Sequence, residues 1–194
     1  VAIRGLEHHF IRWGPESDDP VLLLHGFADC AATFQFVADE IDPGLPLVAI
    51  DWRGFGGSAP GAGPLTMERI ADDGAALLDH LGIEKAVVGG CSMGGYAALA
   101  FVRRHPQRLA GLVLQDTRAG ADTAEAKASR AALAGKVLAE GASATVEAFL
   151  PKLVGETTRR ERPQVVEAVR ERILATPPSA IAAALHGLAA RDAL

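Results

Sequence analysis

A serine with glycines close on both sides is the part of this sequence best suited to covalent chemistry. The run Gly90-Cys91-Ser92-Met93-Gly94 has the pattern G-x-S-x-G, follows the apolar stretch Ala86 to Val88 and opens a helix-like segment, Met93 to Arg104. This order is typical of a nucleophile elbow, in which a tight strand-to-helix turn holds a serine hydroxyl above a sheet. Glycines are needed beside the serine because a Cβ would clash in so tight a turn. The sequence therefore predicts Ser92 as a nucleophile.

A serine hydroxyl needs partners, because near neutral pH it reacts only when a histidine base, itself oriented by a carboxylate, takes its proton. His186, in the apolar segment Ala180 to Leu188, is the candidate base. Asp116 is the candidate acid because it ends the predicted strand beside that of Ser92. A structural role is the alternative for both. The other histidines lie in an opening hairpin-like segment, after the first buried strand and at two helix ends: His8, His9, His25, His80 and His105.

The segments that must position these residues alternate between short apolar runs and helix-like stretches. Such runs are typical of strands buried in a parallel sheet. The alternation predicts the order β-α-β-α-β-α-β in a doubly wound, mainly parallel α/β sheet, with Thr66 placed to cap the second helix. The expected strands are Val21 to Leu24, Leu47 to Ile50, Ala86 to Val88 and Gly111 to Leu114, and the expected helices are Ala31 to Ile41, Thr66 to Leu81 and Met93 to Arg104.

Four motifs follow one another along the chain. They are His25-Gly26, Asp51-x-Arg53-Gly54-x-Gly56-x-Ser58, Gly90-x-Ser92-x-Gly94 and Leu112-Val113-Leu114-x-Asp116-Thr117. In this order and spacing they resemble the α/β-hydrolases, in particular the small bacterial esterases and lactonases related to 3-oxoadipate enol-lactonase. The resemblance implies an acyl-enzyme at Ser92, formed from a carboxylic ester or lactone, and an oxyanion hole made by the backbone N–H groups of Phe27 and Met93. No cofactor is expected.

The chain departs from this family in its second half. In the family the acid and the histidine follow late strands, in an apolar-G-x-x-D segment and a later G-H segment, and neither occurs in these 194 residues. We therefore expect a hydrolase core truncated after the sixth strand, with residues 111–114 as an exposed apolar edge that pairs with a second copy or a complementing C-terminal fragment. Two functions stay open: an active serine hydrolase, or a truncated or split domain with little activity by itself that serves as a binding or assembly scaffold.

Residues from about 122 to 190 form an alanine-rich block that is interrupted by glycines and prolines. The block predicts four helices, two of which begin at Pro163 and Pro178. By the resemblance it is a cap above the strand ends, so we divide the chain into an incomplete core, residues 1–120, and a helical cap region, residues 121–194. Some apolar side chains of this region could line a substrate pocket, although packing on the core is the commoner role: Val137, Phe149, Leu150 and Leu153.

Other polar residues near the motifs have structural explanations. We expect His25 to fix the oxyanion loop, and Asp51 and Arg53 to shape a turn at a strand end. Cys91 is a less favoured nucleophile because the flanking glycines centre the turn on Ser92. The same serine would also suit a cofactor-free perhydrolase or haloperoxidase, whereas an epoxide hydrolase or a haloalkane dehalogenase would need aspartate there.

Composition is that of a globular enzyme domain, with 49% hydrophobic and 22% charged residues and a net charge of −5. The mild acidity and the lack of a basic stripe argue against nucleic acid as a partner. No apolar run approaches the ~20 residues that span a bilayer, and no signal peptide precedes Val1, so no membrane partner is expected. Cys30 and Cys91 make no disulfide framework, which favours a cytoplasmic location. No metal-ligand spacing and no phosphate-binding loop are found.

Overall fold

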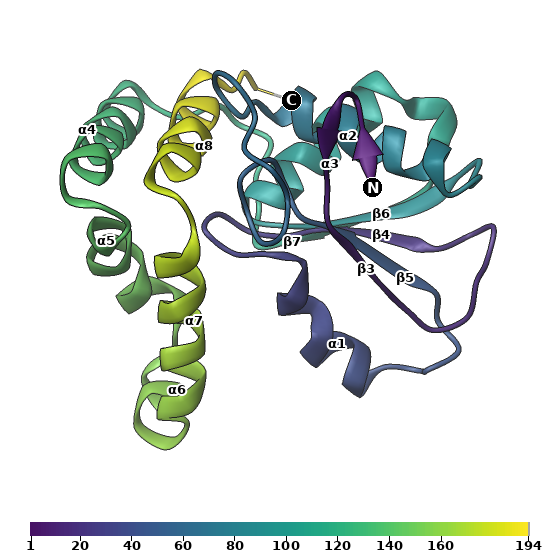
Figure 1. The fold of residues 1–194 in the computed structure, drawn as a ribbon, viewed down its shortest axis with the longest axis horizontal. Helices are drawn as coiled ribbons and strands as arrows, with labels where there is room; N and C mark the ends of the chain where they lie inside the picture. The colour runs from purple at the N-terminus through teal and green to yellow at the C-terminus, as the bar shows by residue number, and fades with distance from the viewer. Residues whose placement is uncertain (194) are drawn as a thin grey trace.

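A mixed sheet of five strands lies at the centre of the structure, a computed structural model that describes residues 1–193 (Figure 1). Its strands are β3 (Phe10–Trp13), β4 (Val21–Leu24), β5 (Leu47–Ile50), β6 (Ala86–Cys91) and β7 (Leu109–Gln115), and β1 (Ala2–Ile3) and β2 (Leu6–Glu7) form a separate hairpin. The strand order is β3-β5-β4-β6-β7, and only β3 runs antiparallel to its neighbour. The predicted mainly parallel sheet is confirmed.

The parallel strands are in register, so their carboxyl ends meet at one edge of the sheet. Leu24 at the end of β4 lies opposite Ile50 of β5 and Gly90 of β6. Open α/β sheets bind their ligands beyond this edge. The segments that follow the strands there begin with His25, Asp51, Ser92 and Asp116.

Two strands are longer than the sequence indicated. β6 continues through Gly89 and Gly90 to Cys91, and β7 begins two residues before Gly111. Glycine usually weakens a strand. Here it leaves room for the neighbouring strand, because a Cβ on Gly89 would lie 3.1 Å from the Leu23 Cδ2 atom.

Helices cover both faces of the sheet, as the doubly wound prediction requires (Figure 1). On one face, α2 (Met67–His80) and α3 (Met93–Arg104) pack against each other. On the other face, the short 3-10 helix η1 (Ala31–Phe34) leads into α1 (Gln35–Glu40). The hydroxyl of Thr66 accepts a hydrogen bond from the Arg69 N–H at 3.2 Å, which confirms the predicted cap of α2.

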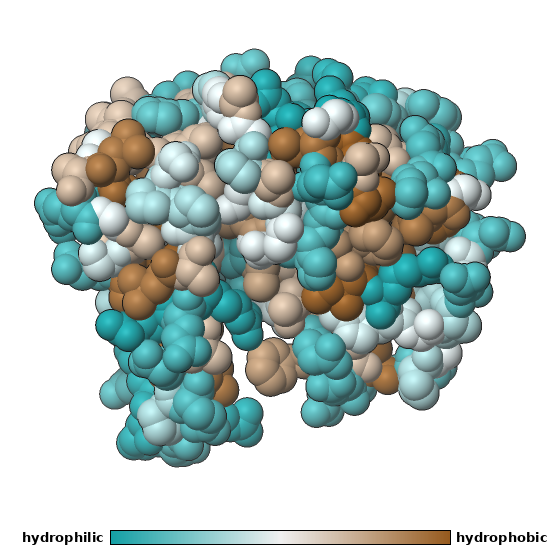
Figure 2. Space-filling model, in the orientation of Figure 1, coloured by the Kyte–Doolittle hydropathy of each residue, from teal (hydrophilic) through white to brown (hydrophobic). Residues whose placement is uncertain are grey.

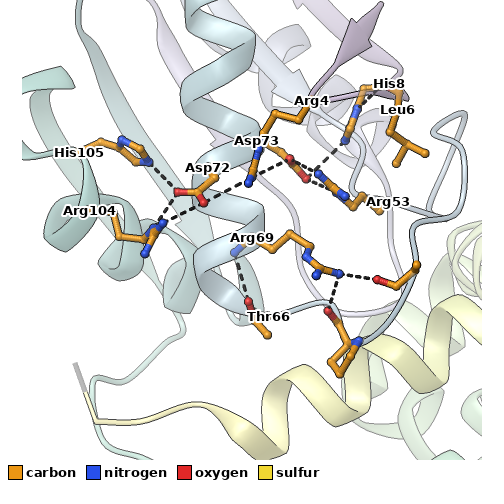
Figure 3. A network of polar contacts seen from close by, with 12 residues as sticks. Arg4, Leu6, His8, Arg53, Thr66, Arg69, Asp72, Asp73, Arg104 and His105 are labelled. Carbon is orange, nitrogen blue, oxygen red and sulfur yellow. Dashed lines mark hydrogen bonds and ion pairs between the residues drawn. The ribbon is translucent and has the colours of Figure 1, made fainter.

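A network of ion pairs joins the N-terminal hairpin to α2 and α3 (Figure 3). Asp73 of α2 accepts two hydrogen bonds from Arg53, each of 2.6 Å. The neighbouring Asp72 accepts two from Arg104, of 2.7 and 2.9 Å. Arg4 of the hairpin turn lies 3.4 Å from Asp72 and 3.3 Å from Asp73. Burial alone would raise the pKa of both aspartates, but these partners outweigh it and lower both values.

The C-terminal block contains five helices, so the prediction of four is wrong. They are α4 (Ala124–Glu140), α5 (Ser143–Leu153), α6 (Glu156–Glu161), α7 (Pro163–Ala175) and α8 (Pro178–Ala190). The additional helix, α6, is a short one that fills the interval between Gly155 and Pro163. Pro151, by contrast, interrupts nothing, because it lies in the last turn of α5. Pro163 and Pro178 begin α7 and α8 as predicted.

The last of these helices, α8, packs closely on a loop of the core. The N–H of Leu65 donates to the carbonyl of Ala183 at 3.0 Å. A Cβ on Gly187 would lie 1.8 Å from the Leu65 carbonyl oxygen, so only glycine fits there. Our boundary between residues 120 and 121 falls in the loop between β7 and α4.

The strand β7 forms one edge of the sheet, where the sequence placed an exposed apolar strand. The exposed fractions of Leu112, Val113 and Leu114 are 38%, 55% and 44%. Large apolar side chains on an unpaired strand are a site for pairing with another strand. Among the described residues no single helix is long and apolar enough to cross a membrane; the bent pair of α7 and α8, at 93°, meets that test only by length and composition.

Candidate active site

Ser92 occupies a strained backbone conformation at the turn between β6 and α3. Its φ is 51° and its ψ is −112°, a combination that residues other than glycine rarely adopt. A Cβ on Gly94 would lie 2.0 Å from the Leu24 carbonyl oxygen, and a Cβ on Gly90 would lie 2.2 Å from the Gly94 carbonyl oxygen. Both glycines are therefore required for the turn. Strain of this kind persists where the surrounding structure holds it, as at functional sites.

Contacts with the end of β7 hold this turn in place. The Ser92 N–H donates to the carbonyl of Gln115 at 2.9 Å, and the Thr117 hydroxyl donates to the Ser92 carbonyl at 2.9 Å. A Cβ on Gly95 would lie 2.5 Å from the Thr117 Cβ, so glycine lets α3 approach this loop. The turn is thereby fixed to the loop that begins with Asp116.

The loop after β4 lies directly beside Ser92. A Cβ on Gly26 would lie 4.0 Å from the Ser92 Cβ and 3.9 Å from the Cys91 carbonyl oxygen. Phe27 follows in the chain. Met93 is the first residue of α3, so its N–H is one of those that have no acceptor within the helix. The two predicted oxyanion donors thus belong to segments on either side of Ser92, and the N-terminus of α3 adds a field that favours negative charge.

A hollow of about 430 Å³ opens at the carboxyl ends of the strands and contains Ser92. It brings Ser92 together with Phe27 and Asp116, two of the predicted site residues. Asp116 has a φ of 46°, which turns the chain away from β7 immediately after the strand. The remaining lining residues come from the loop after β4, from η1 and α1, from the ends of β6 and β7, and from α5 and α7: Gly26, Ala28, Asp29, Thr33, Phe34, Val37, Cys91, Gln115, Lys152, Leu153 and Val169.

Two charged residues in this lining were not predicted from the sequence. Asp29 lies in the loop after β4, and its carboxylate is 3.2 Å from the Arg172 guanidinium of α7. Lys152 comes from α5, and its ammonium is 5.9 Å from the centroid of the Phe149 ring, which in turn lies 5.0 Å from the ring of Phe27. Asp29 lies four residues after His25 of the first motif, and this closeness was a signal that could have identified it. No motif or pattern in the sequence around Lys152 indicates a place in the site.

The helices α5 and α7 thus contact the loop after β4 directly. Of the four apolar residues expected to line a pocket or pack, Leu153 lines the hollow and Phe149 packs with its ring tilted against that of Phe27. Val137 is fully buried in the core instead, as packing requires.

His25 has the structural role that the sequence indicated. Its ring stacks on Trp52 with 3.8 Å between centroids, its Nδ1 lies 2.9 Å from the Gly26 carbonyl, and its Nε2 accepts from the Trp52 N–H at 3.4 Å. Burial lowers the pKa of His25. A neutral ring with its proton on Nδ1 satisfies both contacts and fixes the start of the loop after β4.

The structure does not bring a histidine to Ser92 among the residues it describes. His186 is exposed on α8 and is not part of the lining of the hollow. His9 is occupied elsewhere, with its Nδ1 2.7 Å from the Asp51 carboxylate, and His105 lies 2.9 Å from Asp72. Of the chain's six histidines, none lines this hollow.

Asp51 and Arg53 shape turns, as expected. One oxygen of the Asp51 carboxylate accepts the Ala31 N–H at 2.6 Å and the other accepts the Gly57 N–H at 2.9 Å. These bonds hold the loop after β5 against the start of η1. Arg53 is held by Asp73 in the network described above.

Burial raises the pKa of Cys91, and the charges of Asp116 and Asp29 raise it further. A thiol with a raised pKa carries little thiolate, which is the reactive form. The electrostatics therefore disfavour Cys91 as the nucleophile. Cys30 is likewise an unbonded thiol, with a pKa that burial raises. Within residues 1–193, no group of three metal-ligating side chains is arranged to hold an ion.

Comparison with known proteins agrees with this fold. Residues 19–191 match the family model described as the alpha/beta hydrolase fold. Two curated relatives are each 34% identical: epoxide hydrolase 3 of Xenopus tropicalis over 114 residues, and a putative 2-succinyl-6-hydroxy-2,4-cyclohexadiene-1-carboxylate synthase of Bacillus subtilis over 121 residues. The matched segments cover 58% and 61% of this chain but only 31% and 44% of those relatives, so the chain spans less than half of their length.

Solved structures match over a larger share of the chain. A thermophilic esterase from Thermogutta terrifontis, with malate bound, superposes on 100% of this chain and 72% of its own, with a TM-score of 0.93 and 41% identity. The enol-lactonase from Burkholderia xenovorans LB400 covers 100% of this chain and 74% of its own, with a TM-score of 0.90 and 26% identity.

Proposed function

Because the chain belongs to the alpha/beta hydrolase fold family, we propose that it is a serine hydrolase that cleaves carboxylic esters or lactones through an acyl-enzyme at Ser92. One observation carries this proposal. Ser92 is held at a positive φ on a glycine-flanked turn, and it faces a hollow across from the Gly26-Phe27 loop. The esterase and the enol-lactonase among the similar structures support the same class of substrate.

The proposed reaction begins with attack of the Ser92 hydroxyl oxygen on the substrate carbonyl carbon. The carbonyl oxygen becomes an oxyanion that accepts hydrogen bonds from the N–H groups of Phe27 and Met93, and removal of one such donor typically lowers the rate ~10²- to 10³-fold. The carbon–oxygen bond to the leaving group then breaks, and the leaving oxygen takes up the proton that serine lost. An ester releases a separate alcohol at this step, whereas an opened lactone keeps the new hydroxyl on its acyl group. Water next attacks the acyl-enzyme, releases the acid and restores Ser92.

A base must accept the serine proton, and this step divides two candidate functions. Asp116 lines the hollow and is our proposed acid, whereas the candidate base, His186, is exposed on α8. Because no histidine lines the hollow within residues 1–193, a second proposal has support: these residues alone form a binding or assembly scaffold with little turnover. The oxyanion hole alone would leave a rate roughly 10³- to 10⁴-fold above that in water.

Labelling with a fluorophosphonate probe, measured by intact mass, tests the proposal directly. Rapid labelling with one probe per chain, absent from Ser92→Ala, is the result expected of an activated serine. Slow labelling that is equal in both proteins would contradict an activated Ser92 and leave the scaffold function. His186→Ala is the matched variant, since an exposed residue can be changed without loss of the fold; unchanged labelling would remove it as the base.

The open edge of β7 supports a further part of the proposal, that this strand pairs with another strand. A second copy of the chain or a complementing C-terminal segment could provide it. Light scattering at high concentration separates these cases, because only pairing with a second copy doubles the mass. Val113→Lys, which puts a charge on the edge, should abolish that doubling. A monodisperse monomer would contradict the dimer. We also propose a cytoplasmic location, which fractionation of the native cells would test.

A further inference from the structure

We propose that the substrate of this site carries an extended, uncharged apolar group, and that this group lies in the cleft between α1 and α7 and reaches Phe36 and Val165. This inference rests on the proposed ester or lactone hydrolysis at Ser92. It concerns the part of the substrate that does not react.

A second hollow lies between the same two helices, α1 and α7, that contribute to the hollow containing Ser92. It measures about 390 Å³ and is lined by Phe36, Asp39, Glu40, Thr158, Arg162 and Val165. On α7, Val169 lines the first hollow and Val165 the second. Residues four apart share one face of a helix and lie about 6 Å apart along its axis. The two hollows therefore follow each other along the same face of α7.

The opposite wall of the cleft is formed by α1, which also contributes residues to both hollows. Val37 of α1 lines the first hollow and the adjacent Phe36 lines the second. Figure 1 shows α1 and the arm of α6 and α7 on the two sides of this region, and the surface in Figure 2 is indented between them. One path thus leads from Ser92 outward between α1 and α7.

The cleft keeps large apolar side chains in contact with water. Val37 is 46% exposed, Leu153 is 51% exposed and Phe36 is 60% exposed. Apolar side chains that are exposed together next to a catalytic hollow are typical of a ligand-binding groove. An alkyl chain would cover them, and each buried CH₂ group strengthens binding roughly fourfold.

Charges define the far end of the path. Asp39, Glu40 and Arg162 all line the second hollow, so its lining carries two carboxylates and one guanidinium. A carboxylate at the far end of the substrate would meet this net negative charge. The arrangement favours a neutral tail over an anionic one.

The chain-length preference of hydrolysis tests the inference. We would compare kcat/KM for p-nitrophenyl decanoate with that for p-nitrophenyl butyrate. The wild type should prefer the decanoate, and Val165→Trp, which fills the second hollow, should lower the decanoate-to-butyrate ratio at least tenfold. Glu167→Trp adds the same side chain to an exposed position of α7 outside the lining and should leave the ratio unchanged. An unchanged ratio in Val165→Trp would overturn the inference. If that variant does not fold, Phe36→Asp at an exposed position gives the same comparison.

Binding to Ser92→Ala separates this inference from the proposed function. Calorimetric titration with decanamide and butanamide, neither of which needs to react, should show at least tenfold tighter binding of the longer amide, lost in the double variant with Val165→Trp. If decanamide binds more tightly in this way but the wild type hydrolyses no ester, the apolar binding cleft is supported and the proposed hydrolase function is contradicted. Hydrolysis with equal affinities for the two amides would uphold the hydrolase and overturn the cleft.

Discussion

The guanidinium group of Arg191 lies over the ring of Tyr96, 3.8 Å from its centroid. Arg191 directly follows α8, and Tyr96 is in the first turn of α3, where its N–H donates to the Ser92 carbonyl at 3.3 Å. Arg191 also donates to the Asp122 carboxylate at 2.9 Å and to the Gly120 carbonyl at 2.5 Å. The beginning and the end of the helical region therefore meet on the helix that follows Ser92.

Replacement of Arg191 by alanine should lower the free energy of unfolding by about 3 kcal/mol or more, because it leaves the buried Asp122 carboxylate with one partner fewer and removes the contact with Tyr96. Urea unfolding measures the change. Arg118 binds the same carboxylate but is 57% exposed, so Arg118→Ala is the control, with an expected loss below ~1 kcal/mol. Equal losses in the two variants would contradict the importance of the buried contact.

The carboxylate of Asp122 should make the free energy of unfolding depend on pH in the acid range. Burial alone would raise its pKa, but hydrogen bonds and charges from Arg130, Arg118 and Arg191 lower the pKa to about 2. A carboxyl whose folded pKa lies below its unfolded value of ~3.9 stabilises the fold above that value and loses the effect as pH falls toward 2. Relative to Asp122→Asn, the wild type should therefore lose about 2 kcal/mol between roughly pH 5 and pH 2. A constant difference in stability across that range would rule this out.

Gly94→Ala should be strongly destabilising, by about 3 kcal/mol or more, because its Cβ would lie 2.0 Å from the Leu24 carbonyl oxygen, a backbone atom that cannot move aside alone. A Cβ added to Gly135 in α4 would meet no atom within 4 Å, so Gly135→Ala should instead stabilise by about 0.5 to 1 kcal/mol. Thermal and urea unfolding of the two variants measure whether each change lowers or raises the free energy of unfolding. Similar effects in both variants would mean that the turn can relax.

Ser92→Gly should stabilise the protein by about 1 kcal/mol while it abolishes probe labelling, because glycine adopts a φ of 51° without strain. Ser129→Gly, at an exposed position inside α4, is the control and should destabilise by roughly 0.5 to 1 kcal/mol. A loss of stability in Ser92→Gly equal to that in the control would show that the turn holds no strain.

The elements of the core could be predicted because their signals are local. Ser92 and its glycines adjoin in the chain, the buried strands are short apolar runs, and the Thr66 cap lies next to its helix. The placement of Lys152 and Val169 beside Ser92 could not be predicted, since it depends on how distant helices pack.

The orientation of His186 was equally hidden. α8 is apolar over most of its surface, so the hydropathy pattern did not show which face would be buried. The close fit of Gly187 against Leu65 sets that orientation, and it leaves His186 on the exposed side. A contact between residues so far apart in the chain leaves no trace in the local pattern.

The attachment of α8 to the core has a consequence for which helices can move. Because the Leu65 N–H binds the Ala183 carbonyl and Gly187 leaves no space, α8 cannot swing away from the sheet. Opening is then left to α5, α6 and α7, which would hinge at Gly141, with its φ of 91°, and at the 93° bend between α7 and α8. Hydrogen exchange should accordingly be faster in α5 to α7 than in α8. Half of the helical region is thus fixed to the core, and we expect the other half to be the part that moves.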